Sequence, residues 1–412
     1  MIPSINGDRL WQSLMDMAKI AALPGGGCGR LALTDDDKEG RDLFVSWCTD
    51  AGCAIEIDDM GNIFARRAGS SADAKPVATG SHLDTQPHGG KFDGVYGVLA
   101  GLEVIRTLND HGVETVAPIE VVVWTNEEGS RFAPAMISSG VYADVFDVAY
   151  AHSRTDSGGK TLGEELVRIG YDGDTPCGDH ELGAFFEVHI EQGPILEQEQ
   201  CPIGVVIGGQ GQRWYDVRVD GQDAHSGSTP MPGRRDALVA SAEMVSAIER
   251  VALSRPPYAV ATVGALDVSP NSRNTIPGSV TFTVDIRNPD VDCLQELDEL
   301  FRAGANEIAK SRNVDIHIDE IWHNPPVVFD ADCIAAVSAA ATEMQVRHRE
   351  IVSGAGHDAC MLARKVPTSM IFIPCEGGLS HNEAEYAEPV DLAMGCEILM
   401  RAMLQMAKVT DL

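Results

Sequence analysis

Apolar residues recur along this chain with two different periods. Within VYGVLAGLEVIRTL, at 95–108, they occupy positions 95, 98, 99, 102 and 105, a spacing that predicts a helix with one buried face. The stretch PIEVVVWT at 118–125 is a short, nearly continuous apolar run, which is typical of a strand buried on both faces. Because such strands alternate with helical stretches, the pattern predicts an α/β domain with a mostly parallel sheet.

A different order of elements fills residues 213–327. The pattern predicts strand, helix, strand, strand, helix and strand in turn, at 213–221, 234–251, 258–268, 279–287, 292–311 and 314–322. This β-α-β-β-α-β order is that of a ferredoxin-like domain. Beyond it, a predicted helix at 331–345 and a strand at 369–375 resume the first pattern. Since a chain of 412 residues exceeds what one core supports, we expect a larger domain of residues 1–212 and 328–412 with 213–327 inserted.

The net charge of the chain disfavours some classes of binding partner. It has 62 acidic and 31 basic residues, which gives a formal net charge of −31. This charge repels phosphate backbones and anionic lipid surfaces, so we expect neither a nucleic-acid nor a membrane partner. No apolar run approaches the roughly 20 residues of a membrane span, and residues 1–14 lack the pattern of a signal peptide, which predicts a cytoplasmic protein. Ten scattered cysteines without a C-x-x-C pair predict neither disulfides nor a thiolate zinc site.

One stretch after an apolar strand is rich in side chains that bind metals. GSHLDTQPHGGKFDG, at 80–94, contains His82, Asp84 and Asp93. An isolated H-x-D pair is more often a polar turn than a metal loop, so the rest of the chain has to decide. Three later stretches carry similar residues after predicted strands: Glu127 and Glu128 in VVVWTNEEGSRF, His189 and Glu191 in AFFEVHIEQG, and Ser380 and His381 in IPCEGGLSHNEAEY. Because ligands gather at the carboxyl ends of strands in open α/β sheets, we expect these side chains to meet at one edge of the sheet.

The number of these side chains indicates two metal ions. Three histidines together with Asp and Glu exceed the four ligands of a structural zinc site. A carboxylate can bridge two divalent ions, and Asp93 is our candidate because it lies at the start of the predicted helix, where the helix dipole favours its charged form. Of the two adjacent glutamates, we expect one to bind metal and the other to take a proton from a catalytic water.

Seven stretches together resemble a known enzyme family: GSHLDTQPHGGKFDGVYGVLAG, TNEEGSRF, HIEQGPILE, GQDAHSGSTPM, NTIPGSVTFTVDIRNP, SGAGHDA and LSHNEAEY. In order and spacing they are similar to the dinuclear amidohydrolases of the M20 metallopeptidase clan. Within it they resemble the amidase branch, which comprises N-carbamoyl-L-amino-acid hydrolases, allantoate amidohydrolases and β-ureidopropionases. The resemblance implies a metallopeptidase-like catalytic domain with an inserted lid and dimerisation domain. His189 is the amidase form of its motif, which makes a dipeptidase or deacylase less expected.

The resemblance also implies a role for each residue of the metal site. Five residues would hold two divalent ions: His82 and His189 on one, Glu128 and His381 on the other, and Asp93 between them. Zn²⁺ is expected first, with Mn²⁺, Co²⁺ or Ni²⁺ as alternatives. Glu127 would be the general base. Asp84 would orient His82 through its other ring nitrogen and raise its basicity.

Substrate contacts are implied at five further positions, namely Gln192, His225, Asn274, Arg287 and the backbone of Gly356. The planar fork of Arg287 matches a carboxylate, which suits a small ureido or amide substrate with a carboxylate group. Without the resemblance, we would interpret Arg287 as an ordinary surface arginine. His225 would assist the metals in stabilising the negative charge that develops on the substrate oxygen. His88 and His357 lie in motif loops but are assigned no role.

The expected reaction is hydrolysis of an N-carbamoyl-L-amino acid to the L-amino acid, carbon dioxide and ammonia. Allantoate amidohydrolase and β-ureidopropionase are the alternatives, because only pocket side chains separate them from this activity. A non-catalytic binding protein has no need of a proton acceptor, and Glu127 argues against it. We also expect a homodimer formed through the inserted domain. The sequence leaves open the native metal, the substrate side chain and its enantiomer.

Overall fold

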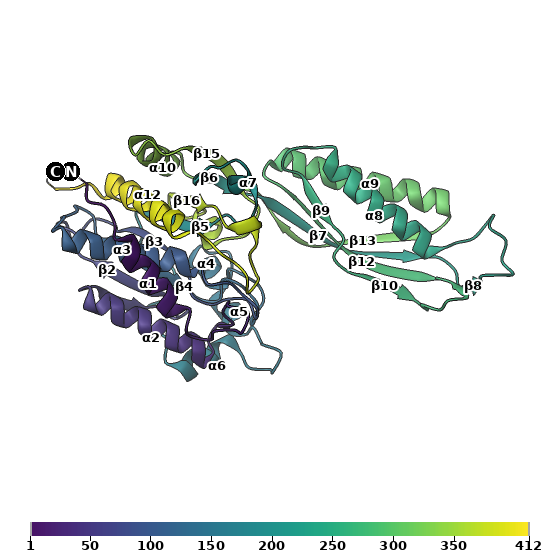
Figure 1. The fold of residues 1–412 in the computed structure, drawn as a ribbon. Helices are drawn as coiled ribbons and strands as arrows, with labels where there is room; N and C mark the ends of the chain where they lie inside the picture. The colour runs from purple at the N-terminus through teal and green to yellow at the C-terminus, as the bar shows by residue number, and fades with distance from the viewer. Residues whose placement is uncertain (1, 411–412) are drawn as a thin grey trace. The chain divides into compact units, whose positions relative to one another are not determined.

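The computed structural model describes residues 2–410 and divides the chain into two compact units (Figure 1). Gly209–Val327 form unit 2, and the segments before and after it form unit 1. Unit 2 thus begins four residues before the predicted boundary, because its first strand begins at Gly211. None of the helices within the described residues is long and apolar enough to cross a membrane.

Unit 1 is built on a nine-stranded sheet with the order β1-β2-β4-β3-β5-β16-β6-β14, and β15 pairs with β6. The strands are β1 (Ala54–Ile57), β2 (Ile63–Arg67), β3 (Val77–His82), β4 (Ile119–Trp124), β5 (Ala184–Ile190), β6 (Ile203–Gly209), β14 (Val327–Val328), β15 (His348–Ser353) and β16 (Thr368–Ile373). The four central strands, β4, β3, β5 and β16, pair in parallel. Every residue of these four strands is buried, as the continuous apolar run predicted for β4.

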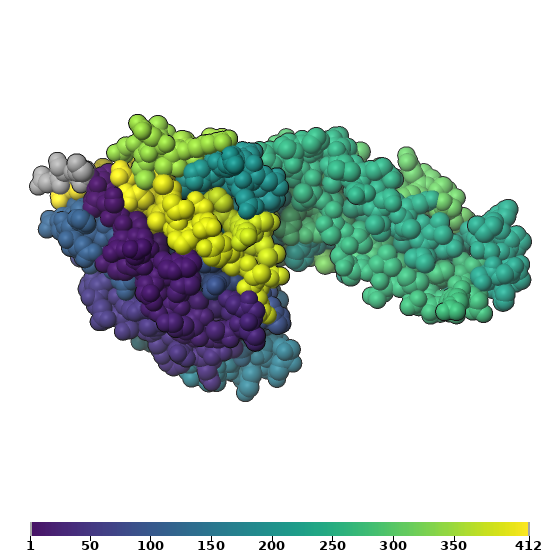
Figure 2. Space-filling view, viewed as in Figure 1, coloured from purple at the N-terminus to yellow at the C-terminus, as the bar shows by residue number. Residues whose placement is uncertain are grey.

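The helices of unit 1 are α1 (Gly7–Met17), α2 (Asp35–Asp50), α3 (Val95–Asp110), α4 (Ile137–Tyr142), α5 (Val148–His152), α6 (Leu162–Ile169), α7 (Ile195–Gln198), α10 (Ala331–Glu343), α11 (Asp358–Leu362) and α12 (Pro389–Ala407), with a 3₁₀ turn η1 (Glu376–Gly378). The predicted helices at 95–108 and 331–345 correspond to α3 and α10. α3 packs between strands β3, β4 and β5 and the helices α1 and α12. α1 and α12 also pack on each other and lie side by side on the surface of the unit (Figure 2).

The start of α3 depends on a glycine. Gly94 precedes the helix with φ +68, and a Cβ atom at this position would lie 2.3 Å from Cε1 of His82. Only glycine combines this backbone conformation with this close approach. The helix consequently begins directly behind Asp93 and beside the end of β3.

Unit 2 has the predicted ferredoxin-like order. Its elements are β7 (Gly211–Asp220), β8 (Ala224–His225), α8 (Ala237–Leu253), β9 (Val260–Thr262), β10 (Leu266–Ser269), β11 (Thr275–Ile276), β12 (Ser279–Asn288), α9 (Val291–Arg312) and β13 (Asp315–Asn324). The sheet runs β10-β12-β7-β13 and is antiparallel. Apolar residues at alternate positions of β7 and β12 face α8 and α9, and the other face of these strands is largely exposed.

One predicted strand of unit 2 is interrupted. The stretch 258–268 forms two short strands, β9 and β10, which pair with different parts of β12. Gly264 lies between them, and the Thr283 side chain accepts a hydrogen bond from the Ala265 N–H across the break. A glycine inside a strand pattern often marks such an irregularity. The ribbon formed by β8 and β11 was not predicted either.

Candidate metal centre

The parallel strands bring the predicted ligands to one edge of the unit 1 sheet. β3 ends at His82, β5 carries His189 one residue before its end, and the loop after β4 contains Glu127 and Glu128. The segment after β16 leads through η1 to His381. These residues meet because parallel strands all direct their carboxyl ends to the same edge.

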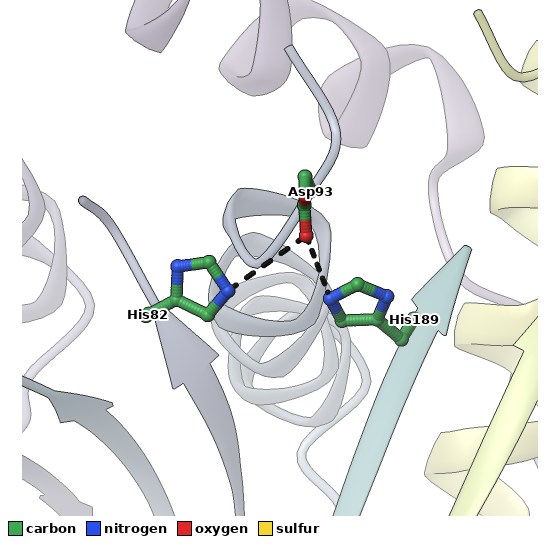
Figure 3. A group of neighbouring side chains, drawn as sticks. All are labelled: His82, Asp93 and His189. Atoms are coloured by element: carbon green, nitrogen blue, oxygen red, sulfur yellow. Dashed lines mark ion pairs between the residues drawn. The ribbon is translucent and has the colours of Figure 1, made fainter. Parts of the chain in front are cut away.

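Two histidines lie on either side of one oxygen of Asp93 (Figure 3). Nε2 of His189 is 3.1 Å from Oδ1 of Asp93, and Nε2 of His82 is 3.8 Å from the same atom. Each ring is fixed from behind, since Nδ1 of His82 donates to the Asp84 carbonyl and Nδ1 of His189 donates to the Ile190 carbonyl, both at 2.8 Å. This tautomer leaves Nε2 of both rings as the atom that can bind a metal.

The other oxygen of Asp93 faces a second group of side chains. Nε2 of His381 lies 3.3 Å from Oδ2 of Asp93 and 3.4 Å from Oε2 of Glu128. Asp93 is therefore shared by two groups of possible ligands, His82–Asp93–His189 and Asp93–Glu128–His381. The first group is fully buried, whereas the His381 side chain is half exposed.

Asp93 is held in place by neighbours that were not predicted to support it. Glu385 is buried, and its Oε1 accepts the backbone N–H groups of Phe92 and Asp93 at 3.0 and 3.1 Å. Ser380 donates to the other Glu385 oxygen at 2.8 Å. Gln192, predicted to contact substrate, donates to Oδ2 of Asp93 at 3.0 Å. The LSHNEAEY stretch was the available signal for Glu385, because a second acidic residue follows the histidine closely.

Glu127 lies beside the first group without belonging to either. Its Oε2 is 3.5 Å from Nε2 of His82, and the residue is 7% exposed. Burial raises the pKa of Glu127 well above its ordinary value, and the negative charges of Asp358 and Glu128 add to this effect. Burial and Asp93 likewise raise the pKa of Glu128 to about 8.

These crowded and buried carboxylates are suited to bind divalent cations. Without added positive charge, ionised Glu127, Glu128 and Asp93 would repel one another in a poorly solvated site. Oε1 of Glu128 is buried and has no hydrogen-bond partner within residues 2–410. A buried carboxylate oxygen without a partner is costly unless a cation binds it, and the donors present are the imidazole and carboxylate groups that Zn²⁺ takes.

Two residues make other contacts in the structure than those predicted for them. Asp84 meets His82 through its backbone carbonyl, while its carboxylate accepts the N–H groups of Glu127 and Glu128, both at 3.3 Å. Glu191 points away from the centre, because β5 ends at Ile190 and the Glu191 carboxylate accepts the backbone N–H groups of residues 195 and 196 at the start of α7. The side chains of a strand alternate between its two faces, but this alternation does not continue beyond the end of the strand when a turn follows.

His357 lies closer to the centre than the sequence suggested. Its ring centroid is 4.6 Å from that of His189, and its buried Nε2 has no hydrogen-bond partner among the described residues. Glu187, on β5, is within metal-binding range of both rings and accepts hydrogen bonds from Ser81 and the Ala359 N–H. The charged residue within the apolar run AFFEVHI was the signal for Glu187, and the SGAGHDA motif was the signal for His357.

The other predicted substrate contacts are divided between the units. In unit 1, Gly356 is exposed, and a Cβ atom at this position would lie 2.7 Å from Cε of Met136. In unit 2, the exposed His225 lies on β8, and Asn274 immediately precedes β11. β8 and β11 pair with each other, and the Ser226 N–H donates to the Asn274 carbonyl, which keeps the segments of His225 and Asn274 together. Arg287 lies on β12, where its guanidinium contacts Asp285 through Nε and Nη2.

Known proteins resemble this chain over nearly its whole length. Residues 78–405 match the model of peptidase family M20/M25/M40. An N-carbamoyl-L-amino-acid amidohydrolase from Rhizobium meliloti is 50% identical over 407 residues, which cover 99% of this chain and 98% of that protein. An allantoate amidohydrolase from Bacillus subtilis is 33% identical over 393 residues, 95% of each chain. The crystal structure of a hydantoinase/carbamoylase family amidase from Burkholderia multivorans is 58% identical over 98% of both chains, with a TM-score of 0.95.

Proposed function

This chain belongs to peptidase family M20/M25/M40, and from that premise we propose that it hydrolyses the ureido C–N bond of N-carbamoyl-L-amino acids. Water adds to the ureido carbon, the bond from this carbon to the amino-acid nitrogen breaks, and the remaining carbamate decomposes to carbon dioxide and ammonia. The higher identity to the Rhizobium meliloti enzyme supports this substrate class over allantoate.

The observation that carries the proposal is the division of the two Asp93 oxygens between two groups of ligands. His82 and His189 would hold one divalent ion, and Glu128 and His381 the other. Zn²⁺ suits these donors, and Mn²⁺, Co²⁺ and Ni²⁺ are alternatives. When bound, such a pair of ions lowers the pKa of water and polarises the substrate carbonyl.

Glu127 acts as the proton carrier in this scheme. It adjoins the ligands but lies outside both groups, so its carboxylate is left to accept a proton from the attacking water. The same carboxyl then gives the proton to the departing nitrogen. The Asp84 carboxylate supports this role, since it accepts the Glu127 N–H and so positions the loop that carries the base.

His225 is suited to stabilise the developing oxyanion. Its Nδ1 accepts the backbone N–H groups of Gly227 and Ser228, at 3.0 and 3.2 Å. With Nδ1 as acceptor, the proton of the neutral ring lies on Nε2, which then points a donor outward from an exposed side chain. A donor of this kind supports transition-state stabilisation once substrate is bound.

Substrate recognition is assigned to the remaining predicted contacts. Arg287 would bind the substrate carboxylate, with Asp285 holding the guanidinium in position until substrate arrives. Asn274 lies beside His225 on the same ribbon and would reach the ureido group. Gln192 and the Gly356 backbone, in unit 1, complete the set.

Ammonia release from a panel of substrates tests the proposal. Metal-free protein, prepared by chelation, is assayed with N-carbamoyl-L-amino acids, their D-enantiomers, β-ureidopropionate and allantoate after addition of Zn²⁺, Mn²⁺, Co²⁺ or Ni²⁺. We expect activity to return with about two ions per chain and to be highest on N-carbamoyl-L-amino acids. A preference for allantoate would show that allantoate, and not an N-carbamoyl-L-amino acid, is the substrate. Saturation at one ion per chain would reject the dinuclear centre.

We also propose that two copies of the chain associate through unit 2. The sheet of this unit ends in the strands β10 and β13, and an edge strand is a natural surface for a two-fold partner. Analytical ultracentrifugation of the whole chain should give the mass of a dimer. A monomer at all concentrations would exclude this association.

A further inference from the structure

Gln86 contacts the metal-ligand candidate Glu128 directly. Its side-chain amide Nε2 donates to Oε2 of Glu128 at 2.6 Å. Gln86 lies two residues after Asp84 in the first metal-rich stretch, and Glu128 lies in the loop after β4, so this bond joins two loops of the centre. The proposed function gives Gln86 no role.

A third residue fixes the orientation of this amide. The Ser130 hydroxyl donates to Oε1 of Gln86, also at 2.6 Å. Because the carbonyl end of the amide is occupied by a hydroxyl donor, the NH₂ end is directed at Glu128. Ser130 and Glu128 belong to the same loop. The Gln86 amide bridges them, because it accepts from Ser130 and donates to Glu128.

The two oxygens of Glu128 consequently differ. Oε2 accepts the Gln86 amide and faces His381 at 3.4 Å, whereas Oε1 is buried without a partner among the described residues. A carboxylate held by one oxygen presents the other in a fixed direction. Outer hydrogen-bond partners of this kind set the geometry of metal ligands, and their loss typically lowers metal affinity or activity about 10- to 100-fold.

We propose that Gln86, oriented by Ser130, is a positioning residue that sets the affinity of the ion held by Glu128 and His381. This inference rests on the proposed function, since it requires Glu128 to be a metal ligand. The effect is specific to that ion, because His82 and His189 are fixed by backbone carbonyls, and within residues 2–410 no hydrogen bond joins either of them to Gln86. The group with His381 is also the more exposed one, so its affinity depends more on how firmly its ligands are held.

Isothermal titration of metal-free protein with Zn²⁺ and with Mn²⁺ tests the inference on four variants. Gln86→Met keeps the side-chain length but removes the amide, and Ser130→Ala removes the hydroxyl that orients it. Glu128→Gln reports on the ligand itself. Gln12→Ala is the matched control, because Gln12 makes the same amide-to-carboxylate contact with Asp16 on the exposed surface of α1.

We expect Gln86→Met to weaken one of the two binding events about 10- to 100-fold and to leave the other unchanged. Ser130→Ala should weaken the same event by less, and Gln12→Ala should bind as the wild type does. At saturating metal, kcat of Gln86→Met should recover, which a misfolded or merely destabilised protein would not do.

Three results would overturn the inference. Unchanged titration of Gln86→Met, with one event lost in Glu128→Gln, would show that Glu128 binds metal without help from Gln86. A rise in KM alone would make Gln86 a substrate contact. If Glu128→Gln also titrates as the wild type does, Glu128 is not a ligand, and it is the proposed function that fails.

Discussion

Asp84 supports His82 through its backbone carbonyl, which accepts the Nδ1 proton of the ring at 2.8 Å. The carboxylate of Asp84 turns instead to the loop after β4, where it accepts the N–H groups of Glu127 and Glu128. One residue thus serves two loops with two different groups. Its backbone orients the His82 ring, proposed as a metal ligand, and its side chain positions the loop of Glu127, proposed as the general base.

The first prediction separates these two contributions. Asp84→Asn keeps the backbone carbonyl but offers only one side-chain oxygen for two N–H groups. We expect kcat to fall at least 10-fold while two ions per chain remain bound, because the His82 ring keeps its support. Elemental analysis and steady-state kinetics on the same preparation check this. Loss of the ion at His82 would instead favour an orienting role for the carboxylate.

The second prediction concerns the general base. Glu127→Gln should retain both ions and lose about 10²- to 10⁴-fold in kcat, because an amide cannot accept the proton. The change is isosteric and replaces a buried carboxylate by a neutral group, so folding should be preserved. Retention of more than about a tenth of the wild-type kcat would show that another group takes the proton.

The third prediction addresses the substrate carboxylate. Arg287→Lys should raise KM more than it lowers kcat, since a point charge cannot reproduce the bidentate fork. Arg218 provides a matched control, because it is on the same face of the same sheet and pairs with Asp220 two residues away. Arg218→Lys should leave KM unchanged. Substrate amides without the carboxylate should not distinguish wild type from Arg287→Lys, and an equal loss on both would give Arg287 another role.

The fourth prediction concerns which copy of the chain supplies His225. If each site is completed by the partner in a dimer, mixing Glu127→Ala with His225→Ala protein restores one intact site in each mixed dimer. Random exchange makes half the dimers mixed, so about a quarter of wild-type activity should return. If native mass spectrometry shows exchange and no activity returns, His225 serves its own chain or has no catalytic role.

The fifth prediction compares two ion pairs of the same spacing on α2. Arg41 and Asp37 are both completely buried, whereas Lys38 and Asp42 are exposed. Arg41→Met leaves the Asp37 charge buried without its partner and should lower the free energy of unfolding by about 3–5 kcal/mol. Lys38→Met should lower it by at most about 0.5 kcal/mol. Urea unfolding of both variants measures the difference, and similar losses would contradict the role assigned to burial.

The sequence was sufficient to predict several elements and which side chains gather at one edge of the sheet. Helix α3 and strands β4 and β16 lie within two residues of their predicted bounds at each end, because their periodicity is local and strong. The predicted ligands His82, Glu128 and His381 do meet at one edge, because a parallel sheet brings its carboxyl ends together whatever the loops do.

Tertiary structure decided which group of each residue makes which contact. No spacing in the sequence could show that Asp84 uses its carbonyl toward His82, or that Glu191 turns to α7, because both depend on the backbone direction after a strand ends. Gln86 and Glu385 were missed for a related reason. Each bonds to a residue more than forty positions away in the chain. A hydrogen bond requires atoms to lie within about 3 Å, a condition that only the folded chain defines.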